Sequence, residues 1–310
     1  MSSSFSNAPK INISQRWVQI GEDINGAENY GRSGYSVSLS GDGKSVAVGV
    51  PTIGLVRIFK NNGNNWVNHG ESNKKDRQGG NSSGESVAIS SDGSVVAIGE
   101  PDYQGEIGQV SIFQNDNGVL TQIGNDIDGA SNWSKSGHSI SLSSDGNIVA
   151  IGAYKESPPH PENQFYLGGR ARIYQNDNGS WKQIGSAFDG ANGDSLGYSV
   201  SLSSDGSIVA IGSIWANTDS SDENYATASD VGSVKIYQND NGNWTQIGKD
   251  IFGDARWDNL GRSVSLSSDG SIVAAGAYNS TAGDNAGYVK IYKNDNGNWT
   301  QIGDDIKGET

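Results

Sequence analysis

Residues 197–212 read GYSVSLSSDGSIVAIG, and this stretch decides the fold. Residues 199–203 alternate serine with valine and leucine, and residues 208–212 again alternate large with small side chains, which is the period of a half-buried strand. Between them, Ser204-Asp205-Gly206 supplies turn residues, with a glycine for the positive φ of a tight hairpin. The stretch therefore predicts two antiparallel strands joined by a short turn.

The same hairpin recurs five times. Its consensus is G-x-S-[VI]-[SA]-[LI]-S-x-D-G followed by V-A-[VIA]-G, and its opening glycines are Gly34, Gly84, Gly137, Gly197 and Gly261. Each copy continues into a third segment, such as residues 234–237, and then through a turn, usually Asn-Gly, into a fourth, such as residues 244–248. The copies are 50 to 64 residues apart, a spacing typical of propeller blades.

We therefore predict an all-β protein, a five-bladed β-propeller of four-stranded antiparallel blades. Residues 15–310 are expected to form this single domain, and residues 1–14 an N-terminal arm. The first two strands carry bulky side chains on one face and small ones on the other, which lets neighbouring blades pack closely. A pair of sandwiches would not explain five copies with the same turn chemistry.

The outer-strand segment occurs six times, once more than the hairpin. The six copies lie around Trp17, Trp66, Leu120, Trp181, Trp244 and Trp299. The last copy follows its own Asn-Gly turn, so its pairing closes only a short loop and has a smaller entropic cost than pairing of the N-terminal copy. The last copy should therefore take the fourth position of blade 5. The N-terminal copy is then a surplus strand at the ring closure. We expect it to add outside blade 5, with self-association through the edge of another molecule as the alternative.

Composition and charge exclude several classes of function. The chain has 310 residues, 44 of them glycine, and a net charge of −14, which disfavours nucleic acid and anionic membranes as partners. No apolar run approaches the ~18 residues of a membrane span and no signal-peptide h-region is present, so no membrane insertion is expected. The compartment stays unknown, with cytoplasmic synthesis without conventional secretion as the default. The chain has no cysteine, which excludes disulfides and thiol catalysis.

The repeat resembles the FG-GAP-type repeat of integrin-α-like propellers. The resemblance rests on G-x-S-V-S-L-S-S-D-G-S-I-V-A-I-G-A followed by G-x-V-x-I-Y and covers residues 15–308. It implies a propeller used in adhesion, sugar binding or assembly. Calcium-binding members carry D-x-D-x-D-G in the first hairpin, where this chain has only Ser-Asp-Gly or Gly-Asp-Gly. No metal and no cofactor are therefore expected, and the acidic loop at Asp219, Asp222, Glu223 and Asp230 is interpreted as solvated.

The variable loops indicate the working face. In a four-stranded blade, the loops between strands 2 and 3 and the crossovers between blades lie at one end, and the two hairpins at the other. The hairpins hardly vary, whereas the loop between strands 2 and 3 spans residues 50–55 in blade 1 and residues 213–231 in blade 4. Because binding usually resides on variable loops held by a rigid scaffold, we expect the site on this loop face.

Two groups of residues are the candidates for ligand binding. One residue follows each opening glycine and should line the mouth of the central channel: Tyr35, Glu85, His138, Tyr198 and Arg262. The second group consists of aromatic residues in the crossovers, Tyr30, Trp133 and Trp257, while Tyr103, Tyr154, Trp215 and Tyr278 lie in the other loops. Exposed Trp and Tyr offer flat amphipathic area for a sugar or a protein. The alternatives are that the mouth residues plug the channel and that the aromatic rings pack their own loops.

No catalytic constellation is evident, so an enzyme is not expected. Glu85 is the only acidic residue at the mouths of the inner strands, although the loop carboxylates Asp194, Asp258 and Glu156 could converge. The three histidines, His69, His138 and His160, lie at unrelated repeat positions, which argues against a metal ion bound by histidines. We expect a non-catalytic recognition module that binds a glycan or a protein. The alternative is a structural subunit that decorates or cross-links a larger assembly, and a glycan-acting hydrolase ranks third.

Overall fold

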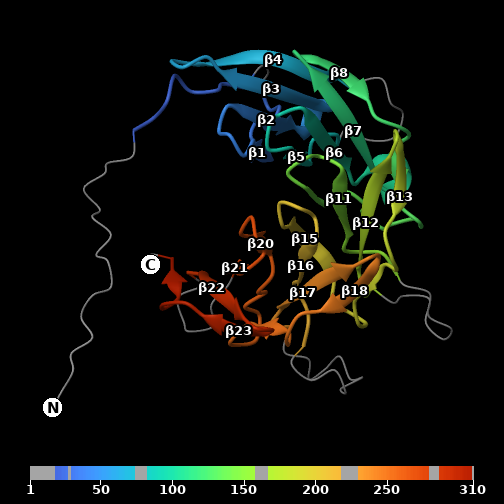
Figure 1. The fold of residues 1–310 in the computed structure, drawn as a ribbon, viewed down its shortest axis with the longest axis vertical. Coiled ribbons are helices and arrows are strands. Elements are labelled where there is room, and N and C mark those ends of the chain that lie inside the picture. The colour runs from blue at the N-terminus through green and yellow to red at the C-terminus, as the bar shows by residue number, and fades with distance from the viewer. Residues whose placement is uncertain are drawn as a thin grey trace.

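A computed structural model shows five antiparallel sheets arranged around a central axis (Figure 1). It describes residues 18–26, 29–73, 82–157, 167–217, 230–278 and 286–308. In every sheet the strands follow one another in chain order, from the axis outward, as in β1-β2-β3-β4. The prediction of a five-bladed β-propeller with four-stranded blades is confirmed.

The five blades have the following bounds. Blade 1 contains β1 (Val37–Leu39), β2 (Ser45–Val50), the 3-10 turn η1 (Pro51–Ile53), β3 (Leu55–Asn61) and β4 (Trp66–Asn73). Blade 2 contains β5 (Ser86–Ile89), β6 (Val95–Glu100), α1 (Tyr103–Glu106), β7 (Gln109–Asp116), β8 (Val119–Gln122) and β9 (Ile127–Asp128). Blade 3 contains β10 (Ser139–Leu142), β11 (Ile148–Ala153), β12 (Arg170–Asp177), β13 (Ser180–Gln183) and β14 (Phe188–Asp189). Blade 4 contains β15 (Leu196–Leu202), β16 (Ile208–Ser213), β17 (Ser233–Asp240), β18 (Asn243–Gln246) and β19 (Ile251–Phe252). Blade 5 contains β20 (Ser263–Leu266), β21 (Ile272–Ala277), β22 (Tyr288–Asp295), β23 (Asn298–Gln301) and β24 (Ile306–Lys307).

The outer strand is interrupted in blades 2 to 5. After four residues it leaves the ladder and then returns to the same third strand, so that β18 and β19 both pair with β17. A side-chain hydrogen bond spans the interrupted part of the strand: in blade 4, Gln246 Nε2 donates to Asp250 Oδ1 at 2.7 Å. The W-x-Q-I-G-x-D-I repeat is therefore one outer strand with a local bulge.

Side chains close the first hairpin of each blade. In blade 4, Ser203 Oγ donates to Asp205 Oδ1 at 2.7 Å, and Ile208 N–H donates back to Ser203 Oγ at 2.9 Å. The N–H of Ser207 donates to Asp205 Oδ1 at 2.9 Å and is the main cause that lowers the pKa of Asp205 below its usual range. The serine and aspartate of the S-x-D-G motif thus form the turn itself, which explains why all five copies keep them.

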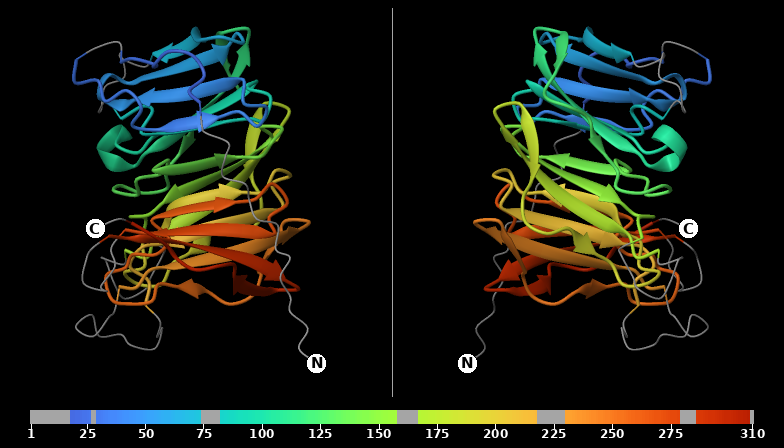
Figure 2. Two further views of the ribbon diagram at one scale, coloured as in Figure 1. Left: turned by 90° about the vertical axis from the view of Figure 1, so that its left-hand side faces the viewer. Right: turned by 90° about the vertical axis from the view of Figure 1, so that its right-hand side faces the viewer.

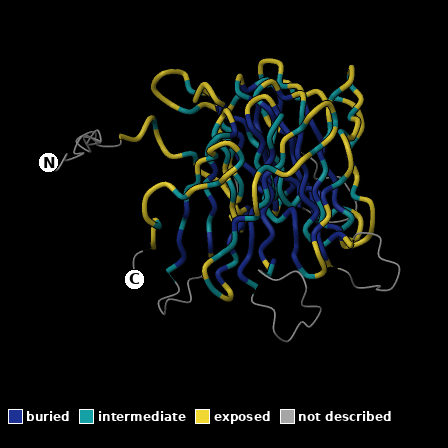
Figure 3. Tube along the Cα trace, turned by 60° about the horizontal axis from the view of Figure 1, so that its bottom comes forward, coloured by how far each residue is buried: buried dark blue, intermediate teal, exposed yellow. Residues whose placement is uncertain are grey.

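Neighbouring blades are joined by the same contacts at four interfaces. The serine of each G-x-S motif donates its hydroxyl to the opening glycine carbonyl of the next blade; the four pairs are Ser36–Gly84, Ser86–Gly137, Ser139–Gly197 and Ser199–Gly261, at 2.6–2.9 Å. At three of these interfaces a tryptophan adds a contact at the periphery: Trp181, Trp244 and Trp299 donate their Nε1–H to the carbonyls of Ile123, Ile184 and Ile247 of the preceding blade, at 2.9–3.1 Å. Apolar side chains fill the space between sheets, so buried residues lie along the strands and exposed residues in the loops (Figure 3).

The fifth interface is missing, and the ring is open between blades 5 and 1 (Figures 1 and 2). Within the described ranges no hydrogen bond joins these two blades. A Cβ added at Gly34 would meet nothing within 4 Å, whereas one at Gly261 would lie 2.4 Å from the Ser233 carbonyl oxygen. Val37 and Leu39 of β1 are 65% and 58% exposed, while Val200, at the position of Val37 in blade 4, is 8% exposed.

The expected position of the surplus N-terminal strand is wrong in two respects. Trp17 lies outside the described residues, and residues 18–26 form no strand. They contact blade 1 instead of blade 5: Glu22 N–H donates to Asn65 Oδ1 at 3.3 Å, and Arg57 Nη1 donates to the Asn25 carbonyl at 3.0 Å. Because the ring is open, blade 5 does not reach this segment, and the uncovered side of blade 1 binds it. The arm predicted for residues 1–14 lies outside the described residues.

Helices contribute almost nothing to the described part of the chain. The longest, α1, has four residues. Within the ranges given above, no helix is long and apolar enough to cross a lipid bilayer.

The open ring gives a direct stability prediction for matched serines. Ser199→Ala should lower the free energy of unfolding by about 1 kcal/mol, because the Gly261 carbonyl loses its hydroxyl partner. Ser263→Ala, the same change in blade 5, should cost clearly less, since Ser263 faces no following blade. Urea unfolding of both variants measures the difference, and equal losses would contradict an open fifth interface.

Candidate functional site

The candidate site lies on the face formed by the crossovers and the loops between second and third strands. The other face carries the short hairpins, whose backbone N–H and carbonyl groups bond from blade to blade, as between Ser204 N–H and Ser268 O at 2.8 Å. Those hairpins are therefore structural. The loop face is therefore the face formed by the crossovers between blades and by the loops between second and third strands.

Four of the five predicted mouth residues form a contiguous chain around the channel. His138 Nδ1 lies 3.8 Å from Glu85 Oε1, and the rings of His138 and Tyr198 lie edge to face with centroids 4.8 Å apart. The guanidinium of Arg262 lies 5.3 Å from the centre of the Tyr198 ring. Each residue comes from a different blade, so the inner strands bring together positions that are 50 or more residues apart.

Tyr35 is the fifth mouth residue and lies at the open end of this chain. It is about half exposed, and its pKa is raised, first by partial burial and then by the negative charge of Glu85. The mouth therefore presents phenol, carboxylate, imidazole and guanidinium groups side by side.

Two loop tyrosines complete the mouth cluster, although the sequence did not assign them to it. Tyr154 packs on His138 and Tyr198 with ring centroids 4.4 and 5.2 Å away. Tyr278 lies under Arg262, whose guanidinium is 4.7 Å from its ring centre. Both follow the second strand of their blade, so their place after the V-A-[VIA]-G motif is the signal that would have found them. The mouth cluster is hereafter Tyr35, Glu85, His138, Tyr154, Tyr198, Arg262 and Tyr278.

The three predicted crossover aromatics are exposed and share an unusual backbone conformation. Tyr30, Trp133 and Trp257 occupy the same repeat position, with φ of 63°, 68° and 70°, and are 93%, 62% and 47% exposed. In blade 4 this position is Gly193, with φ of 91°. A bulky side chain at positive φ is strained by about 1 kcal/mol or more. Tyr30 and Trp133 bury too little of their rings to offset that cost, whereas Trp257 is about half buried and lies 4.7 Å from the Arg256 guanidinium.

Buried polar residues hold the turns that carry these rings. Asp258, directly after Trp257, accepts hydrogen bonds from Ala255 N–H at 2.9 Å and from Tyr288 Oη at 2.7 Å. Ser134, directly after Trp133, accepts from Ser131 N–H at 3.2 Å. The rings of Trp133 and Trp257 thus project from turns that are held by buried hydrogen bonds. The three exposed aromatics Tyr30, Trp133 and Trp257 are called the rim aromatics below.

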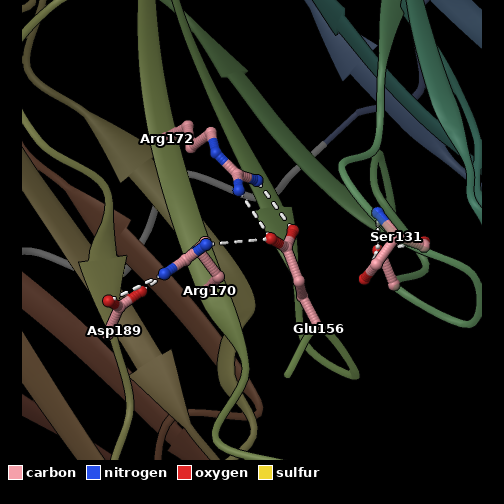
Figure 4. Close-up of polar contacts among 6 residues, drawn as sticks. Ser131, Glu156, Arg170, Arg172 and Asp189 are labelled. Carbon is pink, nitrogen blue, oxygen red and sulfur yellow. Dashed lines mark hydrogen bonds and ion pairs between the residues drawn. The ribbon is translucent and has the colours of Figure 1, made fainter. Parts of the chain in front are cut away.

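The loop carboxylates do not converge into an acid–base pair. Glu156 is almost fully buried and is held by both guanidinium groups of blade 3, with Arg172 at 2.5 and 2.7 Å and Arg170 at 3.1 Å (Figure 4). Asp258 belongs to the turn described above. Asp194 accepts from Ala191 N–H at 3.0 Å, and burial raises its pKa to about 6. Each carboxylate is therefore engaged within its own blade or loop, away from the other two.

The described residues contain no group of three or more His, Asp or Glu side chains that could hold a metal ion. Of the acidic loop, Asp219, Asp222 and Glu223 lie outside the described residues. Asp230 lies inside them; its backbone N–H donates to Asn217 Oδ1 at 2.9 Å, and burial raises the pKa of its carboxyl.

Comparison with known proteins supports the fold. No protein-family model matches the sequence, and no curated protein does. A candidate 6-phosphogluconolactonase from Bacteroides uniformis superposes with a TM-score of 0.58 at 14% identity, over 89% of this chain and 72% of its own. A second candidate 6-phosphogluconolactonase, from Bacteroides fragilis, gives 0.55 at 17%, over 86% and 69%. A candidate TolB from Agrobacterium tumefaciens gives 0.50 at 14%, over 88% and 82%. At these identities the similarity establishes a propeller fold and leaves the function open.

Asp194 predicts a pH-dependent stability with a defined sign. Its pKa rises on folding from 3.8 to about 6, so the ionised form destabilises the fold, fully above pH 6 and not at all below pH 3.8. Asp194→Asn should therefore raise the free energy of unfolding by about 1–3 kcal/mol at pH 7 and hardly at pH 4. Chemical denaturation across this range measures the gain.

The matched control is Asp205→Asn. The pKa of Asp205 is lowered on folding, so its carboxylate stabilises the fold above the unfolded pKa and loses that effect as the pH falls through the folded value. This variant should lose stability at pH 7 and recover toward wild type in acid. A gain for Asp194→Asn that is the same at both pH values would show that Asp194 ionises without penalty.

Proposed function

We propose that this protein is a non-catalytic recognition module that binds a glycan on its loop face. The observation that carries the proposal is the set of rim aromatics, which are exposed at a strained φ where glycine would be the relaxed choice. Folding gains little from Tyr30 and Trp133 in that position, because most of each side chain is exposed. Strain of this kind is typical of functional sites, where the surrounding structure maintains it.

The chemistry of the loop face suits a sugar. Flat aromatic faces pack against the apolar faces of sugar rings, and the mouth cluster adds groups that donate and accept hydrogen bonds. The rim aromatics stand on the separate crossovers that lead into blades 1, 3 and 5, and do not form one continuous apolar patch. This arrangement favours several contacts along an extended glycan over one broad protein interface.

Catalysis is not part of the proposal. The carboxylates a glycosidase would need are engaged in their own loops, and the lactonase activity suggested by two structural neighbours belongs to those proteins. Loss of polysaccharide on incubation with the protein would overturn the non-catalytic part of the proposal.

Replacement of two rim aromatics tests the binding site. Trp133→Ala combined with Trp257→Ala should weaken glycan binding at least about tenfold, a loss of about 1.4 kcal/mol. The melting temperature should stay near that of wild type, because Trp133 is mostly exposed and Trp257 about half exposed, and because alanine can keep the same backbone conformation. A glycan array identifies the probe, and titration calorimetry with that glycan measures the affinity.

Val119→Ala is the control, since Val119 is an exposed apolar residue on the hairpin face. It should leave both affinity and stability unchanged. A collapse of the melting temperature in the double variant would mean that the rings pack their own loops. A blank array together with a protein that binds wild type and not the double variant would replace the glycan by a protein partner.

A further inference from the structure

The two ends of the open ring expose the two halves of one repeated interface. In blade 4, the side that faces the next blade is buried, and Ile251 there is 6% exposed. The same side of blade 5 is uncovered, and the equivalent residue Ile306 is 58% exposed. This side of blade 5 forms a groove of about 610 Å³ whose lining includes Ser263, Gly276 and Val289. On blade 1, the uncovered half is formed by Val37 and Leu39.

Residues 19–26 have the local structure of an outer strand without a blade. Gln19 Nε2 donates to Asp23 Oδ1 at 2.8 Å, as Gln246 does to Asp250 at 2.7 Å and Gln301 to Asp305 at 2.8 Å. Gly21 has a φ of 76°, close to the 73° of Gly248. The segment therefore keeps the bulge of the internal copies although its own inner strands are missing.

The segment also sits on blade 1 as an outer strand sits on the next blade. A Cβ added at Gly248 of blade 4 would lie 2.4 Å from the Gly297 carbonyl oxygen, on the second hairpin of blade 5. A Cβ added at Gly21 would lie 2.9 Å from Asn65 Cα, on the second hairpin of blade 1. By contrast, one at Gly303 of blade 5 would meet nothing within 4 Å. Residues 19–26 thus occupy the outer position of a blade that would precede blade 1.

This occupied position excludes a complete blade. If blade 5 closed onto blade 1, its own bulge at Ile302 and Gly303 would need the place that Ile20 and Gly21 hold beside Asn65. Blade 5 of a second copy would meet the same obstacle. What fits is a unit with three strands and a free outer edge, to which residues 19–26 can add as the fourth strand.

We propose that the open ring is a docking site for the three inner strands of a sixth blade, supplied by a partner polypeptide with the same repeat. Its G-x-S strand makes both missing contacts: its opening glycine carbonyl accepts from Ser263 Oγ, and its serine hydroxyl donates to the Gly34 carbonyl. Its third strand pairs with Gln19 and with residues 24–25, the positions equivalent to Gln246 of β18 and to the two residues of β19. The partner buries Ile306 on one side and Val37 and Leu39 on the other, the apolar surface that each internal interface buries.

A chain that carries its own partner tests the proposal. The probe is a copy of residues 84–116, the three inner strands of blade 2, appended after Thr310 through a flexible Gly/Ser linker. The added strands should raise the melting temperature by about 4 °C or more and slow amide exchange of residues 19–26 at least about tenfold. No change in either quantity would overturn the proposal.

Two matched variants show whether the gain arises at the proposed contacts. Gly84→Val within the appended copy should remove the gain, because a side chain there blocks the approach of the neighbouring blade. Gly21→Leu in the extended chain should remove it as well, by displacing the segment from Asn65, and should leave the melting temperature of the unextended protein unchanged. A gain that survives both changes would mean that the extension stabilises the protein elsewhere.

The unextended protein provides a second measurement, which holds even if the extended chain fails to fold. The proposal requires amides of residues 19–26 to exchange at least about a hundredfold faster than those of β15, since the segment has no paired strand. Exchange as slow as in β15 would mean that the ring closes on its own or with a second copy, and the proposal would be wrong.

Discussion

The propeller depends on one contact, which the opening glycine carbonyl of each of blades 2 to 5 makes with the preceding blade. A Cβ added at Gly49, Gly152 or Gly212 would lie 2.0 Å from this carbonyl oxygen in the next blade, and one at Gly99 would lie 2.2 Å from it. The same oxygen accepts the serine hydroxyl of the preceding G-x-S motif. Neighbouring sheets approach closely at this oxygen for two reasons: the glycine of V-A-[VIA]-G leaves room for it, and the serine of G-x-S donates a hydrogen bond to it. This approach sets the spacing of the blades and thereby brings the mouth residues of different blades together.

The strands and turns were predictable because their causes lie within one repeat. Alternation, Asn-Gly turns and the S-x-D-G turn are all short-range features, and the structure uses each as the sequence suggested. Closure of the ring has another origin. It depends on the angle between neighbouring sheets, summed over all interfaces. A small change of this angle at each interface decides whether the ring closes, and no short sequence pattern determines such a change. The extra copy around Trp17 was the only sequence signal that the ends of the ring are special, and it did not reveal which blade the segment contacts.

The candidate site was predictable in part for the same reason. Residues placed by the inner strands, such as His138 and Tyr198, meet where the repeat alignment put them. Residues on long loops did not follow from the sequence: Tyr154 reaches into the mouth, while Glu156, two residues later, turns inward to the two arginines of its own blade. The strained φ of Trp133 and Trp257 was also not visible in the sequence, although Gly193 at the equivalent position hinted at it.

The most direct test of this account compares one substitution at two equivalent glycines. Gly212→Ala places a methyl group 2.0 Å from the backbone oxygen of Gly261, whereas Gly276→Ala in blade 5 meets only the Ser263 side chain, at 2.4 Å. Thermal unfolding should show a severe loss of stability for Gly212→Ala, or no folded protein, and a melting temperature close to that of wild type for Gly276→Ala. Equal damage at both positions would show that a blade covers Gly276, and would contradict an open ring held together by four copies of this contact.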